Sequence, residues 1–411
     1  MIKDIIQYVI YLTAFISLVS MLSCQNDYPT SMYNNDQQYK PDPVITGIVP
    51  DSAFAGVDTL EIIGENFSDN PDEISVFFNG TKGRVVSSTM TQVNVIPASL
   101  ISDSIKIQLR VFGALSFAEY DSYKLKSAVL EIYDFEEYEK AYGLTTDNDG
   151  NVYFSLVSLD GGKGIKRITQ EGLLEDFVAK AGESYYTDLR FGSDLRVYGS
   201  RTPLVRAIFA GAQGGAPAAI AVPDNSARLV SLDFDNNLNL WTGGLGGKIY
   251  RISPDGSDKK SFQFEPDISA IRYFDGYLYA AAKLDSLEAV WRLPVISSDS
   301  LGQSEIYFRF SDNLPGYTIF SVTFTQDGTL LIGTNAEFTD ENSLIAVSPG
   351  GTYYPWYPGV IAGPVINMTW DKGVYLYYIR EEIKDGNTVA QAQTILRVNM
   401  KTLGAPYYGR D

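Results

Sequence analysis

The 411-residue sequence has no histidine and a single cysteine, Cys24. Without histidine, serine–histidine and cysteine–histidine nucleophile systems and histidine-ligated metal sites are excluded. One cysteine can form neither an intrachain disulfide nor a zinc cluster. Basic residues are scarce too, since 32 Lys and Arg stand against 50 Asp and Glu, giving a net charge of −18. We therefore expect no nucleic-acid partner, and any contact with an anionic membrane requires a dedicated anchor.

The amino terminus supplies a candidate anchor. An apolar stretch from Ile5 to Leu22 ends directly before Ser23 and Cys24. The segment Met21-Leu22-Ser23-Cys24 resembles the lipobox of bacterial lipoproteins, which implies a signal peptide over residues 1–23 and lipidation of Cys24. Several acyl chains on one residue anchor a protein stably. The alternative is an uncleaved membrane helix, because a stretch of this length just suffices to span a bilayer.

A polar segment follows the cysteine. Residues 24–42 are the lipidated cysteine and a stretch that contains two prolines and has no hydrophobic periodicity. Such a composition predicts a flexible tether. Fully extended, it would reach about 60 Å, which suits a domain held away from a membrane surface.

Residues 43–126 show short alternating apolar runs separated by turn residues. This pattern predicts a small β-sandwich. The segments Ile48-Val49-Pro50, Ile62-Ile63-Gly64-Glu65-Asn66-Phe67 and Val76-Phe77-Phe78-Asn79-Gly80 resemble an IPT/TIG domain, an immunoglobulin-like fold. Because this fold serves many functions, it indicates architecture and not activity, and we expect a spacer.

Residues 127–411 contain a repeat. A turn-forming Asp or Asn precedes an aromatic or aliphatic anchor, and the six anchors are separated by 45, 43, 38, 52 and 44 residues. The anchors are Tyr153, Tyr198, Trp241, Tyr279, Leu331 and Tyr375. A strand with a central basic residue follows most of them, as in Ile165-Lys166-Arg167-Ile168 and Ile395-Leu396-Arg397-Val398. A period near 44 with strands and turns alone predicts propeller blades.

The predicted fold is therefore all-β, an immunoglobulin-like β-sandwich followed by a six-bladed β-propeller. The repeat resembles those of NHL and related six-bladed propellers. An orphan strand, Ala128–Phe135, precedes the first blade, and we expect it to pair with the sixth blade and close the ring. Otherwise the sixth blade would expose an edge strand. The segment from Gly404 to Tyr408 is a candidate to share this closure.

The centre of the ring decides whether a metal-dependent enzyme is plausible, because some six-bladed propellers are lactonases or lyases with carboxylates in the central channel. The positions expected to line that channel are Gly143, Asp188, Ser231, Ala270, Ser321 and Val365. One acidic residue falls short of the several oxygen ligands that hard cations prefer. The sequence therefore predicts no metal, no other cofactor and no catalytic residue, and assigns Asp188 mainly to a turn or to backbone hydrogen bonds.

Two loops have acids at alternate positions, as calcium loops do. They are Asp147–Asn151 and Asp233–Asn237. In the first loop the twelfth position of the EF-hand pattern is Ser158 and not glutamate. We interpret both loops as β-turns between blade strands, and a weak calcium site is the alternative that stays open.

Aromatic residues in expected blade connections are the candidate ligand-binding groups. Tyr185 and Tyr186 precede the second blade, and Trp356 and Tyr357 lie between prolines before the sixth. Tyrosine and tryptophan combine an apolar face with a polar tip, which suits stacking on sugars or gripping a partner protein. With Asp188 these four residues form the candidate ligand site. Tyr353 and Tyr354 can equally be packing residues of an outer strand.

The combination resembles IPT/TIG-plus-NHL lipoproteins of Bacteroidota, which are often linked with polysaccharide uptake. That resemblance implies an outer-membrane, lipid-anchored protein on the cell surface that binds a glycan or another extracellular ligand without catalysis. Two alternatives stay open. One is a metal-dependent propeller lyase or lactonase, and the other is an interaction scaffold docked on an outer-membrane transporter.

Overall fold

The computed structural model describes residues 39–136, 138–182, 185–201, 206–222, 227–338, 340–385 and 388–411. The signal peptide, Cys24 and the tether up to residue 38 lie outside the described residues. Within those ranges, no helix is both long and apolar enough to cross a membrane.

The first domain is a β-sandwich of two sheets, with strand orders β1-β3-β7-β6 and β2-β9-β8-β4-β5. Alternate residues of strands β3, β4, β7 and β8 point into one apolar core that includes Leu60, Val76 and Leu109. This alternation is what the period-two sequence pattern predicts. The strands are β1 (Val44–Val49), β2 (Ser52–Phe54), β3 (Leu60–Glu65), β4 (Ile74–Phe78), β5 (Thr81–Lys82), β6 (Arg84–Ser88), β7 (Gln92–Ile96), β8 (Ser102–Val111) and β9 (Ala118–Lys126).

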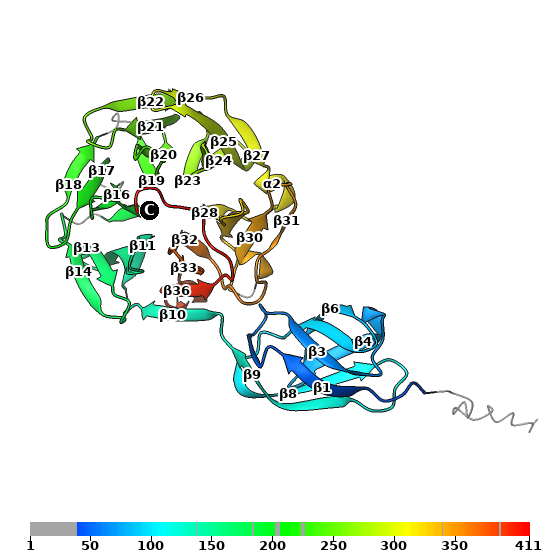
Figure 1. The fold of residues 1–411 in the computed structure, drawn as a ribbon. Coiled ribbons are helices and arrows are strands. Elements are labelled where there is room, and N and C mark those ends of the chain that lie inside the picture. The colour runs from blue at the N-terminus through cyan, green and yellow to red at the C-terminus, as the bar shows by residue number, and fades with distance from the viewer. Residues whose placement is uncertain are drawn as a thin grey trace, which may run out of the picture.

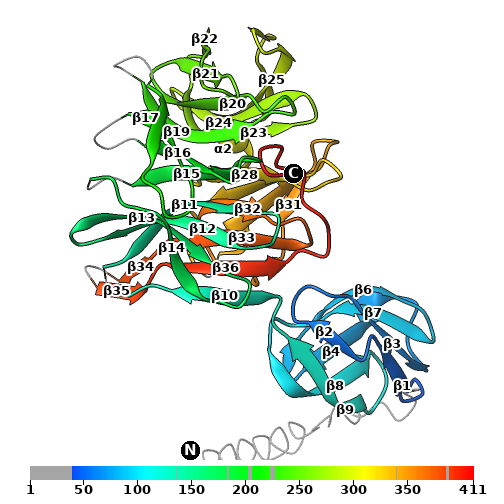
Figure 2. The same ribbon diagram turned by 60° about the vertical axis from the view of Figure 1, so that its left-hand side comes forward.

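The second domain is a ring of six antiparallel sheets, seen nearly along its axis in Figure 1 and from the side in Figure 2. Each sheet is one blade, and its first strand lines the central channel. Blades one to three are β11 (Lys140–Thr146), β12 (Val152–Ser158), β13 (Gly161–Ile168) and β14 (Leu174–Val178); β15 (Tyr186–Phe191), β16 (Val197–Arg201), β17 (Ala207–Gly211) and β18 (Ala218–Ala221); and β19 (Arg228–Phe234), β20 (Leu240–Leu245), β21 (Lys248–Ile252) and β22 (Lys259–Gln263).

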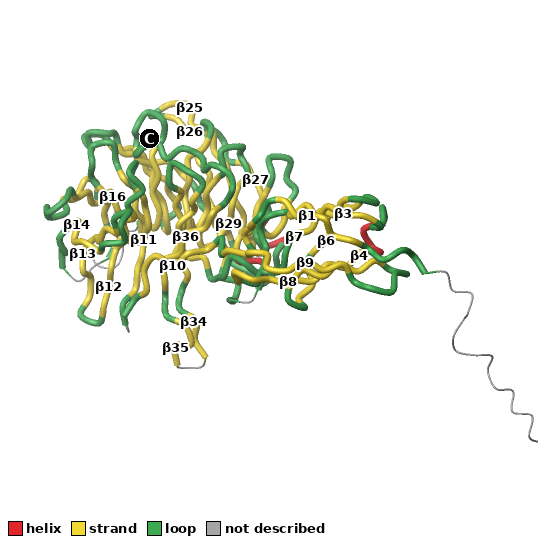
Figure 3. Tube along the Cα trace, turned by 60° about the horizontal axis from the view of Figure 1, so that its bottom comes forward, coloured by secondary structure: helices red, strands yellow, loops and turns green. Residues whose placement is uncertain are grey.

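Blades four to six complete the ring. They are β23 (Asp267–Phe274), β24 (Tyr277–Leu284), β25 (Leu287–Ser297) and β27 (Glu305–Phe308), with β26 (Ser300–Leu301) extending β25; β28 (Ile319–Phe324), β29 (Leu330–Thr334), β30 (Leu344–Val347) and β31 (Tyr353–Pro355); and β32 (Val365–Trp370), β33 (Tyr375–Arg380), β36 (Thr394–Asn399) and β10 (Val129–Asp134). The small hairpin of β34 (Ile383–Asp385) and β35 (Thr388–Gln391) projects from blade six (Figure 3). Short helical turns are α2 (Phe310–Asn313), η1 (Pro71–Glu73) and η2 (Glu341–Ser343).

The closure of the ring confirms the expectation for the orphan strand. β10 pairs antiparallel with β36, so blade six combines strands from both ends of the propeller segment. The expectation that Gly404–Tyr408 shares this pairing is wrong. Gly404 forms an isolated bridge with Thr325 of blade five, and the chain then turns into the ring (Figure 1).

The Asp and Asn residues that precede the anchors fold back on their own turns. Asp147 accepts the backbone N–H groups of Asp149 and Asn151, and its other oxygen accepts the Tyr153 hydroxyl at 2.8 Å. Asp235 does the same in blade three and receives the Trp241 indole N–H at 2.8 Å. Asp147 and Asp235 therefore stabilise β-turns, as interpreted from the sequence. The interpretation is wrong for Asp233, which belongs to strand β19 and not to the turn.

The two domains contact each other beside blades five and six. Lys401 Nζ lies 3.0 Å from Asp58 Oδ1 and 5.0 Å from the centre of the Phe54 ring. Gly56 has a φ of +71°, and a Cβ added there would lie 2.6 Å from Val360 Cγ2. Glycine is required at this position both by the backbone and by the close approach of the propeller.

Candidate functional site

The central channel is filled by two layers of side chains from the first strands of the blades. The layer nearer the strand starts contains Asp188, Ser231, Ala270, Ser321 and Asn367, which line a cavity of about 100 Å³. In each of these strands the lining residue follows a bulge in the register. The sequence expectation placed Val365 here, which is wrong, because Ile366 bulges out of the register and the residue after the bulge, Asn367, faces the channel.

Asp188 is buried and accepts hydrogen bonds from several directions. Its oxygens lie 2.6 Å from Ser231 Oγ, 2.9 Å from Arg190 Nη1 and 3.4 Å from Asn367 Nδ2. It also accepts the backbone N–H groups of Leu189 and Leu232. The assignment to backbone hydrogen bonds therefore holds, but the residue also faces the channel and has an ion-pair partner.

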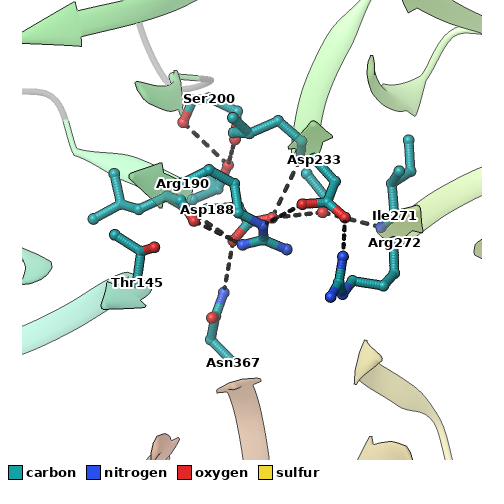
Figure 4. A network of polar contacts seen from close by, with 12 residues as sticks. Thr145, Asp188, Arg190, Ser200, Asp233, Ile271, Arg272 and Asn367 are labelled. Carbon is teal, nitrogen blue, oxygen red and sulfur yellow. Dashed lines mark hydrogen bonds and ion pairs between the residues drawn. The ribbon is translucent and has the colours of Figure 1, made fainter. Parts of the chain in front are cut away.

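The second layer contains Asp233, which the sequence pattern had assigned to a β-turn. Asp233 lies 2.9 Å from Arg190 Nε and 2.6 Å from Arg272 Nη1, and all three side chains are buried (Figure 4). Although burial opposes its charge, the neighbouring Asp188 and Asp233 hold the pKa of Arg190 above its ordinary value. Buried charges require such pairing, because an unpaired charge costs several kcal/mol.

A segment of the chain closes the other end of the channel. The Tyr407 ring is buried, with the guanidinium carbons of Arg190, Arg272 and Arg410 at 5.3, 3.7 and 5.3 Å from its centre. Its hydroxyl lies 2.8 Å from Thr323 Oγ1. Arg410 donates to Thr146 Oγ1 and to the carbonyl of Trp370. The channel is thus a shallow funnel, open on the face where the first strands begin.

A larger hollow lies between the two domains. It has a volume of about 630 Å³, within the range of ligand pockets. Its propeller wall is the segment from Tyr354 to Gly359, and its sandwich wall includes Lys82, Arg84 and Pro97. We call this hollow the interdomain groove.

Aromatic rings form one wall of the interdomain groove. The rings of Tyr354 and Trp356 are inclined by only 23°, with centroids 6.0 Å apart, and Tyr354 is 43% exposed. Trp356 is half-buried, and its indole nitrogen is buried beside Tyr357. Exposed aromatic faces beside polar groups suit a ligand with alternating apolar and hydroxyl surfaces.

The five candidate residues do not form one site. Trp356 lines the interdomain groove, whereas the Tyr357 hydroxyl donates to the carbonyl of Met400 at 2.8 Å. Burial raises the pKa of Tyr357 well above its ordinary value. Tyr357 contacts the groove, but most of its ring packs into the blade-six core.

The tyrosines before blade two occupy other places. Tyr185 stacks on Tyr142, with ring centroids 4.4 Å apart. Tyr186 is wrongly placed among ligand-binding residues, because β15 turns its side chain into the core, where it is 4% exposed. Tyr185 precedes strand β15 and Tyr186 is its first residue, so the two rings occupy different surroundings and do not form one binding surface.

Sequence reasoning missed three groove residues. Tyr354 belongs to the outer strand β31, which agrees with the alternative interpretation from the sequence that it is a strand residue. Its side chain is nevertheless exposed. Lys82 and Arg84 come from the other domain and are exposed, and neither forms an ion pair within the described ranges. Proximity of two domains leaves no local signal in the sequence.

Comparison with known proteins agrees with this architecture. Residues 43–124 match the IPT/TIG domain family. A search of curated proteins found no match for the chain. A structural genomics protein of unknown function from Bacteroides thetaiotaomicron is 12% identical, with a TM-score of 0.50, over 90% of this chain and 100% of that one.

Other solved structures include proteins from two functional classes. A luciferin-regenerating enzyme is 16% identical, with a TM-score of 0.52, over 69% of this chain and 98% of the other. An auxiliary nutrient binding protein from Bacteroides thetaiotaomicron is 10% identical, with a TM-score of 0.48, over 87% of this chain and 97% of the other. At these identities the likeness concerns the fold, and it does not separate binding proteins from enzymes.

Proposed function

We propose that this chain is a non-catalytic, lipid-anchored binding protein of the outer membrane, which captures a glycan in the interdomain groove. The observation that carries the proposal is the near-parallel pair of Tyr354 and Trp356 in a hollow of about 630 Å³. Cys24 would hold the protein at the cell surface, and an outer-membrane transporter is the partner to which a captured glycan would pass.

The central channel is too small to hold a glycan, which favours the interdomain groove as the binding site. Its cavity of about 100 Å³ is too small for a sugar residue with its neighbours. The alternative of a metal-dependent lyase or lactonase would require carboxylates free to converge on an ion. Asp188 and Asp233 accept from Arg190 and Arg272, and a cation would have to displace these arginines.

Binding of the full chain in detergent to a panel of polysaccharides tests the proposal. We expect Tyr354→Ala and Trp356→Ala each to weaken binding of the best polysaccharide by about 2 kcal/mol, some thirtyfold, because aromatic anchors dominate such contacts. Tyr353→Ala is the matched control. It removes an equally exposed ring of the same strand, whose side chain packs beside Phe308 instead.

Two outcomes would contradict the proposal. One is a failure of every polysaccharide to bind. The other is binding that Tyr354→Ala and Trp356→Ala leave at the wild-type affinity while both variants remain folded by circular dichroism.

A further inference from the structure

Blade six leaves two residues of the repeat without the partners that they have in other blades. The first is the turn aspartate. In blades one and three, both oxygens of Asp147 and of Asp235 accept hydrogen bonds, including one from the aromatic anchor six residues later. In blade six, the hydrogen bonds found for Asp371 all reach Oδ1, from the N–H groups of Gly373 and Tyr375.

The sequence explains why Oδ2 of Asp371 does not receive the hydrogen bonds that the second oxygen has in blades one and three. Blades one and three have Asn151 and Asn239 four residues after the aspartate, and each amide donates to the second oxygen. Blade six has Tyr375 at that position. The anchor of blade six that corresponds to Tyr153 is Tyr377. The repeat pattern predicted Tyr375 for this position, which is wrong. The side chain of Tyr377 interacts with Arg397.

The second residue is the arginine opposite the anchor. Arg167, Arg251 and Arg292 each pair with a carboxylate, those of Glu175, Asp258 and Asp299, and Glu305. In blade six the outer strand is β10, which comes from the other end of the propeller segment and places Leu130 opposite Arg397. Among the described residues no carboxylate forms an ion pair with Arg397, whose guanidinium lies 4.5 Å from the centre of the Tyr375 ring.

Both residues line the same cavity. It has a volume of about 520 Å³ and lies between blade six, β10 and the turns of blade one. Asp371 and Arg397 are not in salt-bridge contact with each other, although their charges are opposite. Glu131, Gln170 and Glu171 stand at the exposed edge, so the lining is acidic except at Arg397.

We propose that this cavity binds a small zwitterion, a free amino acid or a short peptide, with its ammonium group at Asp371 Oδ2 and its carboxylate at Arg397. An ammonium group supplies the donors that blades one and three provide from asparagine and the anchor. A ligand carboxylate supplies the acceptor that Arg167 and Arg292 receive from a glutamate of their own outer strands, in a geometry that suits the planar guanidinium. The site is separate from the interdomain groove.

Support from electrostatics is consistent with this geometry. Burial raises the pKa of the Asp371 carboxyl, which is the direction expected for a partly buried acid whose charge is incompletely compensated. A bound ammonium would lower that pKa again.

Calorimetric titration of the full chain in detergent with free amino acids and dipeptides tests the proposal. Each ligand is compared with its N-acetylated and its carboxamide form. We expect at least one free amino acid or dipeptide to bind with a Kd near or below ~1 mM, and each blocked form to bind at least about tenfold more weakly. Whether amino acids or dipeptides bind more tightly identifies the source of the zwitterion.

Variants assign the two contacts. Asp371→Asn keeps an oxygen for the turn and removes the charge, and Arg397→Gln removes the guanidinium, so each should weaken binding about tenfold or more. The matched controls are Asp194→Asn in blade two and Arg292→Gln in blade four, which should bind as the wild type does. Thermal unfolding confirms that the variants fold.

The proposal is overturned if no panel member binds. It is equally overturned if a ligand binds with the same affinity after acetylation, amidation or Asp371→Asn. Because polysaccharide is absent from this experiment, its result is independent of glycan capture in the interdomain groove.

Discussion

The Arg272 guanidinium lies 3.7 Å from the centre of the Tyr407 ring, although the two residues are 135 positions apart in the sequence. Arg272 comes from the first strand of blade four, and Tyr407 from the segment that crosses the ring after its last strand. Arg272 also donates to the carbonyls of Ala405 and Pro406. The contact therefore ties the segment that follows blade six to the centre of the propeller.

Removal of the Tyr407 ring should destabilise the propeller. Tyr407→Ala leaves a cavity against three guanidinium groups, and we expect a loss of about 3–5 kcal/mol in the free energy of unfolding. Tyr407→Phe removes only the hydrogen bond to Thr323 and should cost about 1 kcal/mol. Urea denaturation followed by tryptophan fluorescence measures both, and an Ala variant as stable as the wild type would show that the segment does not fill the channel in solution.

Asp233→Asn, which replaces a carboxylate by a neutral amide, should strongly lower the free energy of unfolding of the propeller. Its carboxylate pairs with Arg190 and Arg272, and a neutral amide would leave both guanidinium groups incompletely paired, at about 3–5 kcal/mol. Asp194→Asn is the control. Asp194 pairs with Arg196 at the surface, where loss of a pair costs less than about 1 kcal/mol. Equal losses in the free energy of unfolding for the two variants would contradict a buried ion-pair network around Asp233 at the centre of the ring.

The stability of the propeller should depend on pH through the ionisation of the buried Glu288 carboxyl group. Burial raises the pKa of this carboxyl, which is 7% exposed and accepts the Ile319 N–H at 2.8 Å. Because the folded pKa exceeds the unfolded one, the ionised form weakens the fold above the raised pKa, and the penalty disappears as the pH falls toward 4.5. Glu288→Gln keeps an acceptor without the charge. We expect it to raise the Tm relative to wild type at pH 8 and to lose this advantage near pH 4.5, whereas a constant difference would contradict the assignment.

Cys24 lies outside the described residues, and its lipidation stays a prediction. Cells that express Cys24→Ser should yield a protein that leaves the membrane fraction and the detergent phase, because the acyl chains supply the attachment. Incorporation of labelled fatty acid into the wild type, but not into the variant, is the direct measurement. Retention of the variant in the membrane would favour an uncleaved helix instead.

Most of the architecture is determined by local sequence. Alternating strands, turn aspartates and anchors at a period near 44 define six blades, because each feature acts over a few residues of one strand or turn. The closing strand was predictable as well, since an unpaired strand before blade one and an exposed edge at blade six each require a partner. The fold class, with an IPT/TIG sandwich before the propeller, is confirmed.

The composition of the channel lining, the buried ion pairs and the interdomain groove depends on contacts between distant segments, which only the tertiary structure shows. A bulge in each first strand determines whether Val365 or Asn367 faces the channel, and no residue signals it in advance. Asp233 becomes a hub residue because the ring brings Arg190 and Arg272 to it from neighbouring blades. Tyr354 and Lys82 share a groove because two domains pack together. Arg397 has no carboxylate in ion-pair contact among the described residues because its outer strand comes from the start of the propeller and places Leu130 opposite it. These relationships depend on distances between segments far apart in the chain, which residue spacing does not encode.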